Sequence, residues 1–414
     1  MPKNSFVFLL AFVIGAQPMA TDLYLPAMPD LARALPEVTL WGLSFASTST
    51  LTFFTLFYGL GQVMGGQWVD RYGRRASLLA SLAIYVLCGL GCSLAPNMAW
   101  LLALRSVQGL AVATIVVAAR AALRDSYSVL DAPRAMSQVF IRMGVIVILC
   151  PLLGGFIATH GGWRATLVAM TIYGTLLLAW VVLRFPETSP AKERGLVGAA
   201  PIKGWQLVQA LWRSRHFRLW TLAAAFTISG VFTFLTITSH LFIGLFGWSP
   251  SHYSWVLTGG AIVFVLSNVA CTRLLQKYSP VRIAKLGAAL SLGGACIQLA
   301  GIGLMATGAI AIPLPALLLV GHYTYQMGHG MLQSCAMTGA VADFPHMAGR
   351  AAAWSGLVMM VMAFVISQTA ASFVNAAHTH GVWPWTLTLL LCGTVLVGVT
   401  SRLREASVRE TIKA

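Results

Sequence analysis

Long, uninterrupted runs of apolar residues separated by short polar breaks dominate the chain. Crossing a hydrocarbon core of about 30 Å takes roughly 20 apolar residues in a helix. The runs do not alternate, and they are far longer than the ~10-residue strands of an outer-membrane barrel, so the pattern predicts membrane-spanning helices. A first set of predicted spans lies at 5–28, 40–65, 76–95, 98–120, 136–159 and 165–184. A second set lies at 219–245, 253–275, 283–307, 311–341, 351–376 and 384–402.

The longest charged stretch of the chain, from Glu187 to Arg218, separates the two sets. We interpret it as a cytoplasmic linker between two domains. The sequence therefore predicts an all-α integral membrane protein with twelve transmembrane helices in two pseudo-symmetric six-helix bundles. The predicted bundles are residues 1–188 and 218–414, joined by a linker at 189–217.

The net charge of +16 changes this picture little, because the basic residues gather in alternate loops. Such an asymmetry is typical of cytoplasmic loops, and it requires an even number of spans with both termini in the cytoplasm. Only 9% of the residues are charged, compared with about 25% in a soluble domain. We therefore expect a protein whose partner is the lipid bilayer and not nucleic acid. The seven cysteines lie within predicted spans without a metal-ligand spacing, so we expect no metal site.

The loop after the second span contains a dense local motif, Gly65 to Arg75, which reads GGQWVDRYGRR. Gly73 permits a sharp turn, Asp70 ends one helix, and the arginines can form ion pairs at the membrane surface. This motif resembles the signature of the major facilitator superfamily at its first cytoplasmic turn. A faint echo at 276–280 indicates an internal repeat.

Two further motifs lie inside spans. The fourth span contains Leu104–Gly109, with Arg105 and Gln108, and it is similar to the arginine motif of that superfamily. A deep arginine costs about 3 kcal/mol on insertion scales, so it is expected to face a cavity or a partner. The fifth span carries residues that resemble the helix-bend motif of drug and proton antiporters, Gly144, Pro151, Gly154 and Gly155, with Cys150 where that motif usually has glycine. Such residues bend a helix or serve simply as a packing surface.

Three more segments resemble the Bcr/CflA branch of bicyclomycin-resistance and chloramphenicol-efflux proteins: Thr21–Pro29, Arg124–Asp125 and Asp343–Arg350. The resemblance implies the major facilitator fold in a bacterial inner membrane, as a monomer. It also implies proton-coupled efflux of compounds such as bicyclomycin, amphenicols, sulfonamides or nucleosides by alternating access, with no cofactor. An exporter or importer of a metabolite on the same fold is the alternative. The sequence does not predict an enzyme, because it contains no HExxH, GxSxG or Walker motif.

Asp22 is the one carboxylate that falls inside a predicted span. There it can load and release a proton as access alternates, or it can cap the kink before Pro26. Arg105 is its natural electrostatic complement, since the first and fourth spans both line the cavity in the resembled fold. Three histidines in other spans are rival proton sites: His240, His322 and His329.

The remaining candidates divide into a pocket and a latch. Aromatic walls with a few polar groups suit flat, semi-polar solutes. The candidate pocket residues are Tyr24, Gln108, Phe232, Phe234, Thr236, His240, Tyr325 and Gln326. With one acid and one arginine in the cavity, we expect neutral or zwitterionic substrates. The candidate latch, a cytoplasmic charge cluster that biases the conformational equilibrium, comprises Asp70, Arg71, Gly73, Arg74, Arg124 and Asp125.

Overall fold

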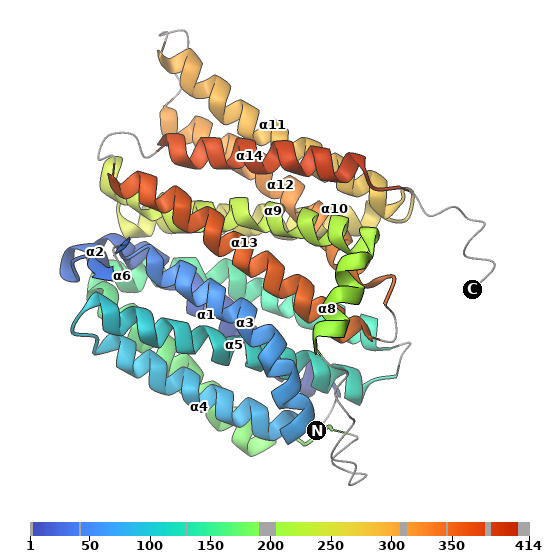
Figure 1. The fold of residues 1–414 in the computed structure, drawn as a ribbon. Coiled ribbons are helices and arrows are strands. Elements are labelled where there is room, and N and C mark those ends of the chain that lie inside the picture. Colours follow the sequence, from blue (N-terminus) through green and yellow to red (C-terminus); the bar gives the residue numbers. More distant parts are fainter. Residues whose placement is uncertain are drawn as a thin grey trace. The chain divides into compact units, whose positions relative to one another are not determined.

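The computed structural model describes residues 3–40, 43–128, 131–189, 204–306, 313–344, 347–376 and 382–404, and nearly all of them are helical (Figure 1). The chain forms two compact units. The first unit comprises residues 1–202 and 235–261, and the second comprises 203–234 and 262–414. The predicted linker at 189–217 lies partly outside the described residues, and the predicted domain division there stays a prediction.

The first unit begins with a span that is interrupted. Its helices before the first long loop are α1 (Lys3–Thr21), the short 3-10 helix η1 (Leu25–Ala27) and α2 (Met28–Ala34). A hairpin follows, in which β1 (Val38–Leu40) pairs antiparallel with β2 (Leu43–Phe45). The remaining helices are α3 (Ser49–Tyr72), α4 (Arg74–Ser93), α5 (Met98–Ser126) and α6 (Ala132–Arg184).

Two predicted spans differ from the observed helices. The span expected from residue 40 starts instead at Ser49, because the β-branched and apolar residues at 38–40 pair as a strand with those at 43–45. The span expected at 5–28 breaks after Thr21. In addition, α6 joins two predicted spans across a kink at Gly162, whose φ of 72° is in the left-handed region that glycine tolerates.

The second unit contains the amphipathic helix α8 (Gly204–Arg213) and α9 (Arg215–Ser239) up to residue 234. The end of α9 and the π-helix η2 (His240–Leu245) that follows it belong to the first unit. The second unit continues with most of α10 (Pro250–Leu274) and with α11 (Pro280–Ala306), α12 (Leu314–Val341), α13 (Ala348–Ala376) and α14 (Val382–Ser401). The backbones of α11 and α12 approach closely, since a Cβ at Gly287 would lie 2.8 Å from the carbonyl oxygen of Gly328. The largest fully buried side chains of this unit include Trp220, Trp385 and Tyr325.

Nine stretches of the described residues are long and apolar enough to cross a membrane. One of them, Ala135–Arg184, covers two predicted spans because of the kink at Gly162. Helices α3 and α12 occupy two further predicted spans, and both carry many polar side chains. The predicted all-helical membrane fold is therefore confirmed, whereas the side of the membrane on which the termini lie stays a prediction.

Candidate functional site

Asp22 lies where the first span breaks. Its backbone N–H donates to the carbonyl of Pro18 (2.7 Å) as the last turn of α1 closes, and η1 begins three residues later. Pro26 and Pro29, each in the first turn of the helix that follows, cannot donate to a continuing α1. The half-buried Asp22 carboxylate accepts a hydrogen bond from the Thr21 hydroxyl (2.7 Å). It does not cap η1, because the N-cap of that helix is Tyr24 and lacks a side-chain cap bond.

Arg105 is fully buried on α5 and binds the end of α1. Its Nη2 donates to the carbonyl of Ala20 (2.6 Å), and its Nη1 donates to Oε1 of Gln108 (2.7 Å). The guanidinium carbon lies 4.4 Å from the ring centroid of Tyr24 and 4.6 Å from that of Phe54. The last four carbonyls of a helix have no hydrogen-bond partner within it and form its negative end. A cation placed there donates to a free carbonyl and also balances the negative charge.

Arg105 and Asp22 therefore lie at the same helix break but do not form an ion pair with each other. The carbonyl that accepts from Arg105 belongs to Ala20, two residues before the carboxylate. Within the described part of the chain, the two side chains form no ion pair. Gln108 fixes the arginine from the other side, because its Nε2 donates to the carbonyl of Tyr85 (3.3 Å). The Asp22 carboxylate is thus not neutralised by this arginine.

The predicted helix-bend motif of α6 packs directly on this break. A Cβ at Gly154 would overlap the backbone carbonyl of Leu23, so only glycine lets the two segments approach this closely. One turn earlier, the Cys150 thiol donates to the carbonyl of Pro18 (3.5 Å). Pro151 lies inside the same helix and Gly144 is half-buried on it. Gly155 instead meets α10 of the same unit, where a Cβ would overlap Oγ of Ser254.

Replacing Gly154 by valine is expected to destabilise the fold by about 3 kcal/mol, at the upper end for overpacking, because a backbone carbonyl cannot move aside as a side chain can. Thermal unfolding of the purified protein in detergent measures this effect. Gly293→Val on α11 is the matched control, since a Cβ there meets no atom within 4 Å. Equal losses in the two variants would show that helix propensity alone, and not the contact with Leu23, sets the cost.

In the second unit the structure brings together aromatic and imidazole side chains from α9, α12 and α14. Phe234 stacks on His322 with ring centroids 3.7 Å apart, and Trp385 lies within 6 Å of both rings. Among the described residues, neither ring nitrogen of His322 nor Nε1 of Trp385 has a hydrogen-bond partner. Oε1 of the buried Gln326 is also unpartnered there. The sequence did not single out Trp385, because aromatic residues are common in spans.

The other candidate pocket residues have separate surroundings. Tyr325 is fully buried and its hydroxyl donates to the carbonyl of Thr227 (3.2 Å), while the hydroxyl of that threonine shares a hydrogen bond with Nδ1 of His329 (3.2 Å). Phe232 and Thr236 are buried on α9. His240 belongs to the first unit, where its Nε2 shares a hydrogen bond with Oγ of Ser47 (3.2 Å). Tyr24 also lies in the first unit, and its hydroxyl shares a hydrogen bond with Oγ1 of Thr50 (3.2 Å).

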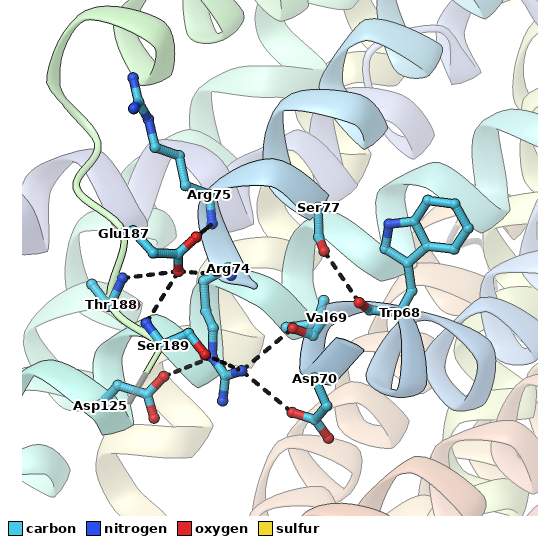
Figure 2. A network of polar contacts seen from close by, with 10 residues as sticks. All are labelled: Trp68, Val69, Asp70, Arg74, Arg75, Ser77, Asp125, Glu187, Thr188 and Ser189. Carbon is cyan, nitrogen blue, oxygen red and sulfur yellow. Dashed lines mark hydrogen bonds and ion pairs between the residues drawn. The ribbon is translucent and has the colours of Figure 1, made fainter. Parts of the chain in front are cut away.

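The candidate latch is centred on Arg74 (Figure 2). Its Nε donates to Oδ2 of Asp125 (2.7 Å), and its Nη1 lies 3.5 Å from Oδ1 of Asp70. The same Nη1 donates to the carbonyl of Val69 and to Oγ of Ser189. Two expected members lie outside this pairing. Arg71 is exposed above the Tyr72 ring, and Arg124 is exposed on α5.

Glu187 is a functional candidate that sequence reasoning missed. Its carboxylate accepts hydrogen bonds from the backbone N–H groups of Arg74 (2.9 Å) and Arg75 (3.3 Å), at the N-terminus of α4 (Figure 2). Gly73 makes this approach possible, because it has a φ of 87° and a Cβ there would lie 2.7 Å from Oε2 of Glu187. A carboxylate is stabilised at a helix N-terminus by the unpaired N–H groups and the helix dipole. The segment that follows α6 is thereby tied to the loop between α3 and α4.

Glu187→Gln keeps the size of this side chain but removes its charge, so we expect a loss of about 1–2 kcal/mol in the free energy of unfolding. The variant is compared with wild type by thermal unfolding in detergent. Glu37→Gln is the control, since the exposed Glu37 carboxylate accepts a hydrogen bond from the Ser44 hydroxyl and not from the backbone N–H groups of a helix N-terminus. An unchanged stability for Glu187→Gln would mean that the carboxylate does not hold the two segments together.

The fold and this site define a multi-pass membrane protein with a charged, interrupted first span. Residues 10–367 match the family described as Major Facilitator Superfamily, and the chain belongs to that family of transporters. It is 25% identical to a bicyclomycin resistance protein homolog of Haemophilus influenzae, over 89% of this chain and 90% of the relative. It is 26% identical to a chloramphenicol resistance protein of Pseudomonas aeruginosa, over 92% and 86%. These relatives confirm the predicted resemblance to the bicyclomycin and chloramphenicol branch.

The crystal structure of a D-xylose-proton symporter has the same fold, with a TM-score of 0.69 and 17% sequence identity. The alignment covers 94% of this chain and 97% of the symporter. The predicted fold class is thus confirmed by an independent comparison of coordinates.

Proposed function

We propose that this transporter is a proton-coupled efflux antiporter of the bacterial inner membrane, working as a monomer by alternating access. Its substrates are neutral or zwitterionic compounds such as amphenicols or bicyclomycin. The observation that carries the proposal is the Asp22 carboxylate at the break of the first span, beside an arginine that is already occupied by Ala20 and Gln108. A carboxylate inside a span that is not neutralised by an ion pair is suited to proton exchange.

One such carrier supplies enough energy for active export. A charge that crosses about 150 mV yields roughly 3.5 kcal/mol. Since a tenfold concentration ratio costs about 1.4 kcal/mol, one proton sustains a gradient of a few hundredfold for a neutral solute.

The substrate class rests on the balance of charge and on the relatives. The described spans offer Asp22 and Arg105 as buried or half-buried charges beside the break, and the second unit offers neutral donors and acceptors at His322, Trp385 and Gln326. Neutral solutes with hydrogen-bonding groups match groups of these kinds better than dications do. The names of the bicyclomycin and chloramphenicol relatives support the same class.

The Arg74 cluster acts in this proposal as a conformational latch. Asp125, Asp70 and Glu187 hold the loop between α3 and α4 in one arrangement without touching the substrate. A contact that exists in one conformation and not in the other biases the equilibrium between them.

Inverted membrane vesicles test the proposal. Respiration acidifies their interior, and a pH-sensitive dye reports proton efflux when amphenicols, bicyclomycin, sulfonamides or nucleosides are added. We expect dequenching with at least one neutral or zwitterionic compound, and none in vesicles that lack the protein. Uptake that survives collapse of the proton gradient, or a strong preference for dicationic dyes, would contradict the proposal.

A further inference from the structure

A basic elbow joins α8 to α9 in the second unit. We define the elbow by Trp212 and the three arginines Arg213, Arg215 and Arg218. Only Ser214 separates the two helices, and α8 runs at a steep angle to α9 (Figure 1). A candidate span begins at Arg215, so the elbow lies at the boundary of the membrane. A binding site at this elbow would be separate from the proposed transport activity.

One face of α8 is buried, whereas the elbow at its C-terminal end is exposed. Leu207 and Leu211 are 5% and 2% exposed, whereas the Trp212 side chain remains 39% exposed. The strongly amphipathic pattern of α8 is typical of helices that lie in the membrane interface. Trp212 has the residue type that is enriched at the level of lipid headgroups.

The three arginines are exposed and form no ion pair with any described residue. Arg215 and Arg218 are three residues apart on α9, so they share a face of that helix. The nearby acid is already engaged, since Oδ2 of Asp343 accepts from the Ser214 hydroxyl (2.7 Å) and Oδ1 lies 3.3 Å from Nδ1 of His216.

We propose that the basic elbow binds the phosphate headgroup of an anionic phospholipid. Guanidinium groups match phosphate oxygens in a bidentate geometry, and residues 213–218 carry three of them directly after an exposed tryptophan. A free phosphate ion would interact with the same arginines, but neither Trp212 nor the membrane boundary would strengthen its binding. The proposed ligand is therefore a lipid such as cardiolipin or phosphatidylglycerol.

Lipid titration of the purified full-length protein, followed by native mass spectrometry and thermal unfolding, tests this inference. Each basic side chain near an anionic surface is worth about fivefold in binding, so the combined variant Arg213→Gln, Arg215→Gln, Arg218→Gln is expected to bind cardiolipin about 100-fold more weakly. The charge-matched control combines Lys285→Gln, Arg402→Gln and Arg404→Gln, and it is expected to change the affinity less than twofold. Arg215→Gln alone, with an expected fivefold loss, serves if the triple variant does not fold.

Three results would overturn the inference. Equal losses in the elbow and control variants would reduce the effect to net charge. Unchanged cardiolipin binding in both the triple and the single elbow variants would remove the site. Displacement of the lipid by millimolar inorganic phosphate, with equal stabilisation by phosphate alone, would make the elbow a site for free phosphate. Phosphatidylcholine is expected to give no stabilisation.

Discussion

Asp22→Asn is expected to abolish uphill export and substrate-dependent proton release, while substrate binding stays within about twofold of wild type. Asparagine has nearly the shape of aspartate and still accepts the hydrogen bond from the Thr21 hydroxyl, so the break after α1 keeps its geometry. Asparagine cannot carry a proton, however, so the proposed antiport cycle would lose its coupling ion. Dye dequenching in inverted vesicles measures the first effect, and equilibrium binding to the purified protein measures the second.

Asp30→Asn is the matched control for this experiment. Asp30 lies eight residues further along, on α2, and pairs with Arg33 near the end of that helix. Its replacement is expected to leave coupled transport unchanged. Active extrusion by Asp22→Asn would rule out this carboxylate as the proton carrier, and the three histidines would then be the next candidates.

Much of the fold was predictable because the bilayer imposes a simple rule. Runs of about 20 apolar residues form helices in a bilayer, because hydrocarbon offers no hydrogen bonds and a helix pairs the backbone N–H and C=O groups with one another. The rule fails where local chemistry competes with it. The prolines at 26 and 29 divide the first span, and residues 38–40 pair as a strand with 43–45 where the sequence predicted the start of a helix.

The candidate site shows the same division between local and distant contacts. Asp70 and Arg74 are four residues apart, and a motif reveals them. Glu187 binds the N–H of Arg74 across 113 positions of the chain, and no spacing rule reaches that far. The expected partner of Arg105 was a carboxylate, but the observed partner is a backbone carbonyl of Ala20. Carbonyls without a helical partner arise where a helix ends or where a proline removes the donor, and no spacing rule links the carbonyl of Ala20 to an arginine 85 positions away.

Arg105→Lys is expected to reduce transport at least tenfold although it conserves the charge. A lysine ammonium is a compact point charge and lacks the planar guanidinium with which arginine donates hydrogen bonds to Ala20 and Gln108 at the same time. It also stacks less well between the rings of Tyr24 and Phe54. Arg105→Gln should lower the free energy of unfolding by about 3 kcal/mol, more than Arg105→Lys does. Hydrogen bonds to a charged group contribute about 1.5–3 kcal/mol, and the cation–π contacts are lost as well.

Thermal unfolding and vesicle transport, measured on the same preparations, separate the two roles of this arginine. Arg142→Lys is the control, because Nη1 of Arg142 on α6 donates to Gln138 within its own helical turn. If Arg105→Lys transports like wild type, the site needs only a positive charge, and the bond to the broken end of α1 has no part in the cycle. If it folds normally but does not transport, the geometry of that bond sets how the break and its carboxylate are presented to each side of the membrane.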